Sequence, residues 1–324
     1  MAINRLTTAA LRALSYPDID IKKNYRLDRA AKRLLHPRVK FLYHSWDHTV
    51  ELDGREIPVR VFLPTEQRSP EIFLFFHGGG WVSGNIDSYT QLCGHLAEQT
   101  GRRVLSVDYR LAPEHRFPCG LEDCYAVARK LFAECGTLDI APEDILLIGD
   151  SAGGNLAAAV SLMAADRGEF MPRRQVLLYP AVQSDFSEAS PFASVHENGQ
   201  GYLLTAKMIS DYLALYMQDE TDRQNPYFSP LLAPVLSGQP ETLIITAEFD
   251  PLRDEGEAYA ARLREAGVPV TLHRVADALH GFFSLPPIFE VVKTAYGYLA
   301  EFLGEQPAQK DDNGTHESNQ DKME

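Results

Sequence analysis

The stretch Gly149-Asp150-Ser151-Ala152-Gly153 fits the pattern G-x-S-x-G and decides the fold of this chain. An apolar run at 145–148 before it predicts a strand, and small residues at 155–159 after it predict a helix. A serine on such a sharp turn adopts a strained backbone conformation that exposes its hydroxyl. The flanking glycines remove Cβ atoms that would collide across the turn. Because free N–H groups at the helix start favour negative charge, the stretch predicts a nucleophile that attacks a carbonyl.

The overall charge of the chain restricts its partners. The 324 residues carry a formal net charge of −14. Six acids and two lysines give residues 305–324 a charge of −4, which leaves −10 for residues 1–304. An acidic balance argues against nucleic acid as a partner, and it disfavours binding to an anionic membrane surface. We therefore expect no nucleic acid and no membrane partner.

The cysteines and the N-terminal residues predict a cytoplasmic protein. Four cysteines are too few and too irregularly spaced for a disulfide scaffold or a zinc ribbon, so we expect reduced thiols. Arg5 and Arg12 interrupt any apolar run that could act as a signal peptide. No window is long and apolar enough for a transmembrane helix. The cysteines are Cys93, Cys119, Cys124 and Cys135.

Apolar runs alternate with helical patterns along most of the chain. The predicted strands lie at 44–52, 57–63, 72–76, 103–107, 145–148, 176–179, 243–246 and 270–275. The predicted helices between them lie near 89–99, 119–133, 155–165, 254–266 and 288–303. Mostly apolar strands separated by helices predict an α/β fold with a mostly parallel central sheet and helices on both of its faces.

Three segments depart from this alternation. Residues 2–42 show helical spacing, and about sixty residues after Pro180 contain no obvious strand but include a helical pattern at 204–217. A connection of that length is usually a functional lid, and its tyrosines argue against disorder. Residues 305–324 have the composition of a disordered tail. We predict a helical cap segment at 1–42, a core at 43–181 and 226–304, a cap insertion at 182–225, and a disordered acidic tail at 305–324.

A serine nucleophile needs a base and an acid that orients the base. In a strand-turn-helix arrangement of this kind, the chain order is serine, then acid, then histidine. Asp250 follows the strand at 243–246, and Pro251 disfavours a helix there. Glu248 and Asp254 are the competing carboxylates, the first within reach of the strand and the second placed to cap a helix. We expect Asp250 to be the acid.

His280 is the predicted base. It follows the last predicted strand and lies 30 residues after Asp250. Among the ten histidines, only His280 and His316 follow Asp250 in a loop, and His316 lies in the polar tail. His273 lies inside the predicted strand. A histidine of this kind can also be structural, but its order and position favour a catalytic role.

The run His77-Gly78-Gly79-Gly80-Trp81 follows the strand predicted at 72–76. Three glycines let the backbone approach a substrate with unshielded N–H groups, as an oxyanion requires. A flexible glycine-rich turn would not explain why the run follows a buried strand. A phosphate cradle is disfavoured because no Gly-Lys-Ser/Thr follows. The run therefore predicts an oxyanion-binding loop.

These motifs together resemble the hormone-sensitive-lipase family of α/β-hydrolases, also called bacterial family IV esterases. The resemblance covers about 45–304, and the chain looks most similar to bacterial acetyl esterases. It implies an α/β-hydrolase fold with one helical cap over the site. The motifs that carry it are 77–80, 149–154, Asp108-Tyr109-Arg110-Leu111-Ala112-Pro113-Glu114, 250–254 and 280–282.

The resemblance also implies an activity and further site residues. Gly78, Gly79 and Ala152 would donate the oxyanion N–H bonds. The enzyme would be a serine carboxylesterase that cleaves short acyl esters of small molecules through an acyl-enzyme, with Ser151, Asp250 and His280 as its triad. No metal or organic cofactor would be needed. Some members of the family are homodimers.

Two further groups of residues have predicted roles near the site. Asp108-Tyr109-Arg110 is a hallmark of the family, and we expect it to brace the site as a charge-paired turn. Trp81, Phe249 and Phe282, and also Phe283, flank the motifs and could line the substrate pocket, although each could equally be a core aromatic.

Two other functions remain open. Relatives that share a His-Gly-Gly-x-Trp start include arylformamidases, and residues 77–81 also fit that pattern. A ligand-binding module on the same scaffold is the third interpretation. The presence of His280 argues against it, since receptors that resemble this family lack the catalytic histidine.

Overall fold

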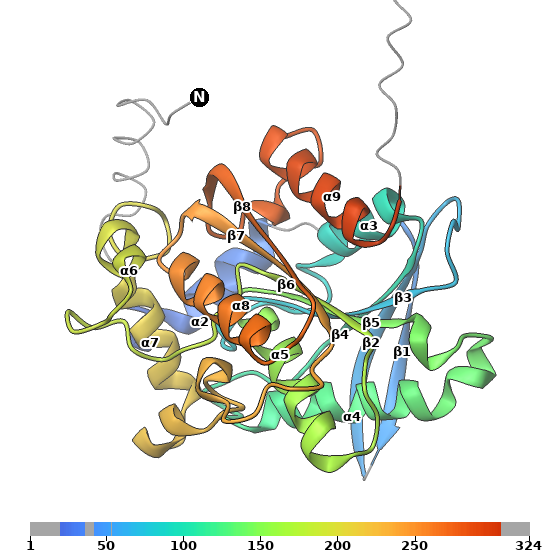
Figure 1. Cartoon of the computed structure of the whole chain (residues 1–324), viewed down its shortest axis with the longest axis horizontal. Helices are drawn as coiled ribbons and strands as arrows, with labels where there is room; N and C mark the ends of the chain where they lie inside the picture. The colour runs from blue at the N-terminus through green and yellow to red at the C-terminus, as the bar shows by residue number, and fades with distance from the viewer. Residues whose placement is uncertain (1–19, 36–41, 53, 306–324) are drawn as a thin grey trace, which may run out of the picture.

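The computed structural model describes residues 20–35, 42–52 and 54–305. Its centre is one eight-stranded sheet with the strand order β1-β2-β4-β3-β5-β6-β7-β8 (Figure 1). The first strand pairs antiparallel with the second, and the second pairs antiparallel with β4, whereas the other neighbours are parallel. The strands are β1 (His44–Leu52), β2 (Arg55–Leu63), β3 (Ile72–Phe76), β4 (Arg103–Val107), β5 (Ile145–Asp150), β6 (Arg174–Leu178), β7 (Glu241–Phe249) and β8 (Val270–Leu279).

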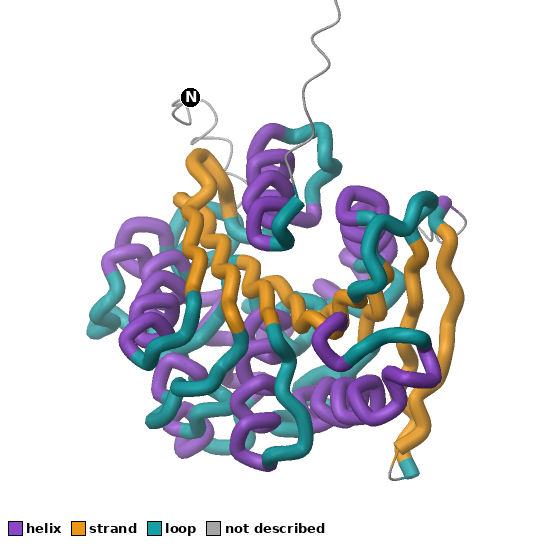
Figure 2. The backbone as a smooth tube through the Cα atoms, turned by 45° about the vertical axis from the view of Figure 1, so that its right-hand side comes forward, coloured by secondary structure: helices purple, strands orange, loops and turns teal. Residues whose placement is uncertain are grey.

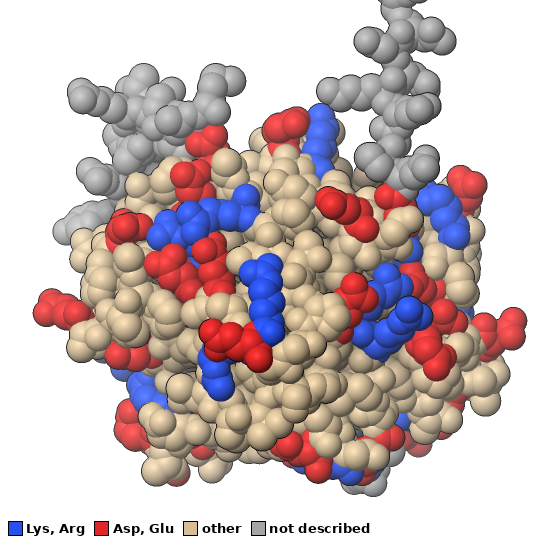
Figure 3. Space-filling view, in the orientation of Figure 1, with Lys and Arg blue, Asp and Glu red and all other residues tan. Residues whose placement is uncertain are grey.

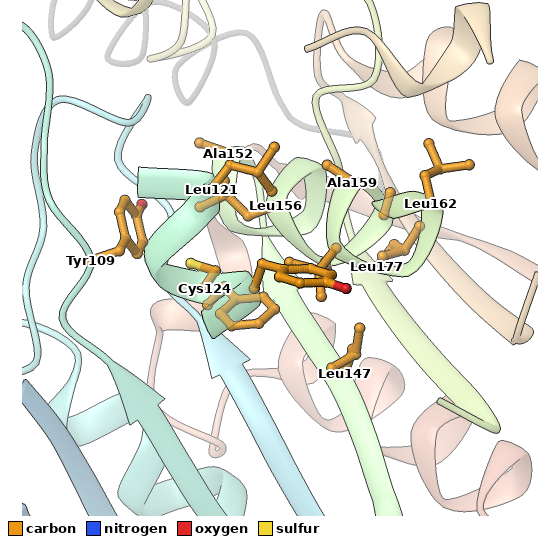
Figure 4. Packing of buried hydrophobic residues seen from close by; sticks show 14 of the residues in the cluster. Tyr109, Leu121, Cys124, Leu147, Ala152, Leu156, Ala159, Leu162 and Leu177 are labelled. Atoms are coloured by element: carbon orange, nitrogen blue, oxygen red, sulfur yellow. The ribbon is translucent and has the colours of Figure 1, made fainter. Parts of the chain in front are cut away.

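Helices cover both faces of this sheet (Figure 2). One face packs against α3 (Thr90–Thr100) and α9 (Glu290–Phe302), and the other against α4 (Cys119–Glu134), α5 (Ala152–Arg167) and α8 (Arg253–Glu265). Covering both faces explains why β3 and β5 are buried along their whole length. Figure 4 shows Leu121 of α4, Leu147 of β5 and Leu156 of α5 in the larger core. The predicted α/β-hydrolase fold is confirmed.

Three helices, α2 (Ile21–Leu35), α6 (Ala193–Asn198) and α7 (Ala206–Tyr216), lie together at one side of the sheet (Figure 1). The N–H of Ile21 donates to Asp211 Oδ2 at 3.2 Å, which joins α2 to α7. Arg29 donates to the carbonyl of Val82 at 2.6 Å and pairs with Glu114 at 2.9 Å, so α2 is also tied to the core. The helix predicted at 204–217 is α7, whereas α6 was not predicted. Residues 1–19 and 36–41 of the predicted cap segment lie outside the described residues, and its boundaries stay a prediction.

Short 3-10 helices occupy several connections: η2 (Cys135–Leu138), η3 (Pro142–Asp144), η4 (Glu220–Gln224), η5 (Pro230–Leu232) and η6 (Phe282–Ser284). Two strands extend well beyond their predicted ranges: β7 runs over Glu241–Phe249 rather than 243–246, and β8 continues to Leu279 rather than ending at Val275. A register shift in β7 between Ala247 and Phe249 lets Phe249 pair with Leu279. His280 therefore follows the sheet directly.

Charged side chains of both signs are interspersed on the face drawn in Figure 3. Arg274 pairs with Glu257 at 2.7 Å, and Arg253 pairs with Glu197 at 2.9 Å. This face has no extended basic surface of the kind that nucleic acid requires. At the end of α9, Glu305 pairs with Arg102, whereas residues 306–324 of the predicted tail lie outside the described residues. None of the described helices is both long and apolar enough to cross a membrane.

Candidate active site

Ser151 occupies the sharp turn between β5 and α5. Its φ is 55°, which lies in the left-handed region. A residue with a side chain is strained in that conformation. The turn is tight enough to require the neighbouring glycines. A Cβ on Gly149 would lie 2.1 Å from the carbonyl oxygen of Gly153, and a Cβ on Gly153 would lie 1.9 Å from that of Phe76. The predicted strand, turn and helix are all present, and they expose the hydroxyl at the carboxyl edge of the sheet.

The structure brings Ser151, His280 and Asp250 together. Nε2 of His280 lies 2.9 Å from Oγ of Ser151, and Nδ1 of His280 lies 2.7 Å from Oδ2 of Asp250. Asp250 is fully buried, and its Oδ1 accepts the N–H of Leu252 at 2.9 Å. With a proton on Nδ1, His280 donates to the carboxylate, and its Nε2 is free to accept the serine proton. This is the hydrogen-bond order that an activated serine requires.

The two competing carboxylates are used elsewhere. Glu248 lies in β7, and its Oε2 accepts the N–H of Asp277 at 2.7 Å. Asp254 accepts the N–H of Ser194 at 2.7 Å and pairs with Arg253. Both carboxylates hold loops near the site, and neither is hydrogen-bonded to His280. The choice of Asp250 from the chain order therefore agrees with the geometry.

The glycine loop after β3 departs from the predicted pattern at one residue. The N–H of Gly78 donates to Oδ1 of Asp150 at 2.8 Å, and the hydroxyl of Tyr89 donates to Oδ2 of Asp150 at 3.1 Å. An N–H that donates to a buried carboxylate is not available to an oxyanion. Gly78 therefore does not fit the role predicted for it.

Gly80 is the better second donor on this loop. Together with Ser151, Ala152 and His280 it lines one cavity, whereas neither Gly78 nor Gly79 does. Gly79 and Gly80 have φ values of 108° and 63°, which glycine adopts readily. No backbone acceptor within the described part of the chain takes the N–H of Gly79, Gly80 or Ala152. These three N–H groups are thus the available donors beside Ser151.

The environment of Asp150 shifts its ionisation. Burial raises the pKa of Asp150 to about 6, although the hydrogen bonds from Gly78 and Tyr89 and the nearby His280 favour the charged form.

On the far side of the loop, the hydroxyl of Tyr109 donates to the carbonyl of His77 at 2.7 Å, and the two rings stack at 4.2 Å. Burial lowers the pKa of His77 to about 4, so this ring is neutral near pH 7.

The Asp108-Tyr109-Arg110 turn braces this loop, as predicted. Oδ1 of Asp108 accepts the N–H of Ile86 at 3.2 Å. The guanidinium of Arg110 forms a two-pronged pair with Asp123, at 2.7 and 2.8 Å. These contacts fix the turn to α4, next to the stacked Tyr109 and His77.

The cavity beside Ser151 has a volume of about 290 Å³. Of the four aromatic residues predicted as possible wall residues, only Trp81 lines it. Phe249 stacks on Tyr202 at 5.3 Å, and Phe282 is buried against Tyr179 at 5.5 Å. Phe283 is also buried, against Tyr296. These phenylalanines are core or support aromatics, which was the alternative interpretation.

Most of the apolar wall comes from the cap and was not predicted. The wall residues are Leu203, Leu204, Met208, Ile209, Tyr212 and, from the core, Leu252. The helical spacing at 204–217 could have indicated them, because a cap helix has to turn one apolar face toward the sheet. The structure thus places an apolar chamber between α7 and the serine.

The parallel sheet and the serine on the strand-to-helix turn define the class of this protein, an α/β-hydrolase. Comparison with known proteins also identifies its sequence family. A sequence family described as alpha/beta hydrolase fold matches residues 73–284, and the chain belongs to this family.

Relatives span most of the chain. It is 38% identical to an arylesterase of Saccharolobus solfataricus over 78% of this chain and 81% of that protein. It is 40% identical to an ethyl acetate hydrolase of Pseudomonas putida over 78% of this chain and 79% of that protein. A solved hyperthermophilic esterase of Pyrobaculum calidifontis has a TM-score of 0.80 at 36% identity and covers 93% of this chain and 97% of its own.

Proposed function

We propose that this protein hydrolyses short-chain acyl esters of small molecules through an acyl-enzyme formed on Ser151. Membership of the family and its named relatives make the chain a carboxylic ester hydrolase. The proposal specifies which residues catalyse the reaction and which esters the cavity accommodates. The observation that supports it best is the continuous contact from Ser151 through His280 to Asp250.

In the proposed reaction, Ser151 Oγ attacks the ester carbonyl while His280 Nε2 takes its proton. Asp250 keeps the other ring nitrogen protonated and stabilises the imidazolium that forms. His280 then gives the proton to the leaving alcohol. A water molecule enters, loses a proton to His280 and attacks the acyl carbonyl. Collapse of that intermediate releases the acid and returns the proton to Ser151.

Each tetrahedral intermediate places a negative charge on the former carbonyl oxygen. We propose that the N–H groups of Gly79, Gly80 and Ala152 bind this oxygen. Ala152 begins α5, so the helix dipole adds to its N–H. Asp150 holds the glycine loop against the serine turn by its bond to Gly78. Donors that are already in place need not reorganise when the charge appears.

The size of the cavity supports a short acyl chain. Its volume of about 290 Å³ lies near the lower end of the range for ligand pockets. The test is a series of p-nitrophenyl esters from acetate to dodecanoate, with an aryl formamide as comparison. We expect kcat/KM to be highest for acyl chains of about two to six carbons and the formamide to be a poor substrate. A maximum at dodecanoate, or a preference for the formamide, would contradict the proposal.

The role of Ser151 has its own test. Diethyl p-nitrophenyl phosphate should form a covalent adduct that peptide mass spectrometry locates on Ser151, with parallel loss of esterase activity. A non-catalytic binding module would not react. The homodimer and the cytoplasmic location expected from the sequence stay predictions.

A further inference from the structure

A second cavity, of about 580 Å³, lies away from Ser151, toward the amino ends of β3 and β4. Trp46, Val61 and Leu105 are neighbours across β1, β2 and β4, so their side chains lie on one face of the sheet. Opposite them, α4 contributes Val127 and Leu131, which are four residues apart and share one face of that helix. The cavity is therefore enclosed by regular structure on two sides.

The apolar walls of this cavity remain open to water. Val61 and Leu105 are only half-buried, although each lies within the sheet. At the mouth, Trp46 is 44% and Leu138 is 45% exposed. The volume lies within the range of small-molecule pockets, which are mostly apolar with a few placed polar groups. Leaving such a wall wet costs free energy that an apolar ligand would recover.

One cation in the wall, Arg103, has no ion-pair partner among the described residues, although Glu134 also lines the cavity. Nε of Arg103 is buried without a hydrogen-bond partner, while its Nη2 donates to the carbonyl of Pro70 at 3.0 Å. Within residues 20–35, 42–52 and 54–305, no Asp or Glu forms an ion pair with Arg103. Burial lowers the pKa of Arg103, and Asp139 and Asp144 act on it only through space.

The neighbouring cations are neutralised, which sets Arg103 apart. Arg102 pairs with Glu71 at 2.6 Å on the other side of the strand. Lys130 also lines the cavity, but it pairs with Glu134 at 2.9 Å. The guanidinium of Arg103 is half-buried, and its buried Nε leaves one donor unsatisfied, which an incoming acceptor would satisfy.

We propose that this cavity is a second binding site and that it takes an amphipathic monocarboxylate, such as a medium-chain fatty acid. The carboxylate would accept from Arg103, whose fork of donors suits a carboxylate. The alkyl chain would lie along Val61, Leu105 and Leu131. Medium-chain acids are longer than the acyl groups proposed for the active site. The proposal does not depend on the catalytic mechanism, because its test uses enzyme with Ser151 blocked.

The two tryptophans of the chain provide the measurement. Trp46 lines the second cavity and Trp81 lines the first. In the full-length Trp81→Phe variant, treated with diethyl p-nitrophenyl phosphate, the fluorescence reports Trp46 alone. We expect 11-bromoundecanoate to quench it saturably. Equilibrium dialysis of dodecanoate against blocked enzyme with both tryptophans gives a second measurement that does not rely on Trp81→Phe folding.

The variants test the contacts. Arg103→Gln should weaken binding of the carboxylate about tenfold or more, because a charge-assisted bond is lost. It should change binding of 11-bromoundecanol less than threefold. Val61→Phe should weaken binding of both, because the larger ring narrows the cavity where the alkyl chain would lie. Arg173→Gln, at an exposed arginine, is the matched control and should bind as the parent enzyme does. Circular dichroism checks that each variant is folded.

Two results would overturn the proposal. One is the absence of a saturable signal in both quenching and dialysis. The other is equal carboxylate affinity in folded Arg103→Gln and Arg173→Gln, which would mean that the acid adsorbs without using the site.

Discussion

The carboxylate of Asp150 accepts the N–H of Gly78 at 2.8 Å across 72 residues of sequence. Through this bond the serine turn and the glycine loop are held in one geometry, and a second bond from Tyr89 at 3.1 Å fixes the carboxylate itself. The middle residue of the G-D-S motif is thus a positioning residue for the loop that carries the proposed oxyanion donors.

Asp150 should make stability depend on pH. Burial raises its pKa from 3.8 to about 6 in the folded chain, so the folded state holds the proton more tightly than the unfolded state does. The contribution of Asp150 to the free energy of unfolding is therefore greatest below about pH 4, falls as the pH rises to about 6 and is constant above that. The total change is about 3 kcal/mol.

The variant Asp150→Asn should remove this dependence. Its free energy of unfolding, measured by urea denaturation from pH 3 to pH 8, should rise by up to about 3 kcal/mol relative to the parent between pH 4 and pH 6. Titrations of the other groups cancel in the difference. A difference that stays constant across this range would contradict the raised pKa.

Replacing Ser151 by alanine should remove nearly all turnover. We expect kcat to fall by about 10⁴-fold or more, because only binding and the oxyanion donors remain. Initial rates with p-nitrophenyl acetate measure it, and Ser187→Ala, at an exposed serine, is the control. Retention of more than about 1% of the activity in Ser151→Ala would show that another group is the nucleophile.

Gly80 should tolerate no side chain while Tyr212 is present. A Cβ on Gly80 would lie 2.4 Å from Cγ of Tyr212, so the loop would have to move. We expect Gly80→Ala to lower kcat about a hundredfold, the effect of losing one oxyanion donor. The double variant Gly80→Ala/Tyr212→Ala should recover part of this loss, because the clash is gone. Alanine keeps the N–H and acts only by displacing the loop, so equal kcat for Gly80→Ala and the parent would contradict the expected clash with Tyr212.

The sequence does not decide whether Gly78 or Gly80 carries an oxyanion-binding N–H. That Ser151, Asp250 and His280 lie together could be predicted, because local strand signals and a fixed chain order place them at one edge of the sheet. Which glycine N–H faces the substrate depends on the contact between Gly78 and Asp150, and no local pattern encodes that contact. The helical spacing at 204–217 indicates an apolar face on the cap helix, but it does not say which residues of that face reach the cavity. That Met208 and Tyr212 do so depends on how the cap packs over the sheet.

Met208 should limit the length of the acyl chain. It lies on α7 and lines the cavity of about 290 Å³ beside Ser151. Met208→Trp should fill the far part of that space. We expect kcat/KM for p-nitrophenyl octanoate to fall at least about tenfold, a loss of the size that a few methylenes contribute. The value for the acetate ester should stay within about twofold, and Met171→Trp, at a surface methionine 38% exposed, should change neither. An equal loss of kcat/KM for the octanoate and acetate esters in Met208→Trp would mean that this residue does not limit the length of the acyl chain.

Glu255 should anchor the start of the cap insertion to α8. Its side chain is fully buried at the start of α8, and Oε1 accepts the N–H groups of Val182 and Gln183 at 2.7 and 3.3 Å. Burial raises the pKa of Glu255 well above 4.5, so glutamine is a close substitute for its protonated form.

Glu255→Ala leaves both N–H groups buried without an acceptor, whereas Glu255→Gln keeps one oxygen for them. We expect the alanine variant to lose about 3–5 kcal/mol of unfolding free energy, and the glutamine variant about 1–2 kcal/mol. Urea denaturation at pH 7 measures both values. KM for p-nitrophenyl butyrate should rise more in the alanine variant, because residues 203–212 reach the cavity through the segment that Glu255 holds. Equal stabilities of the two variants would show that the backbone acceptor is not what anchors the insertion.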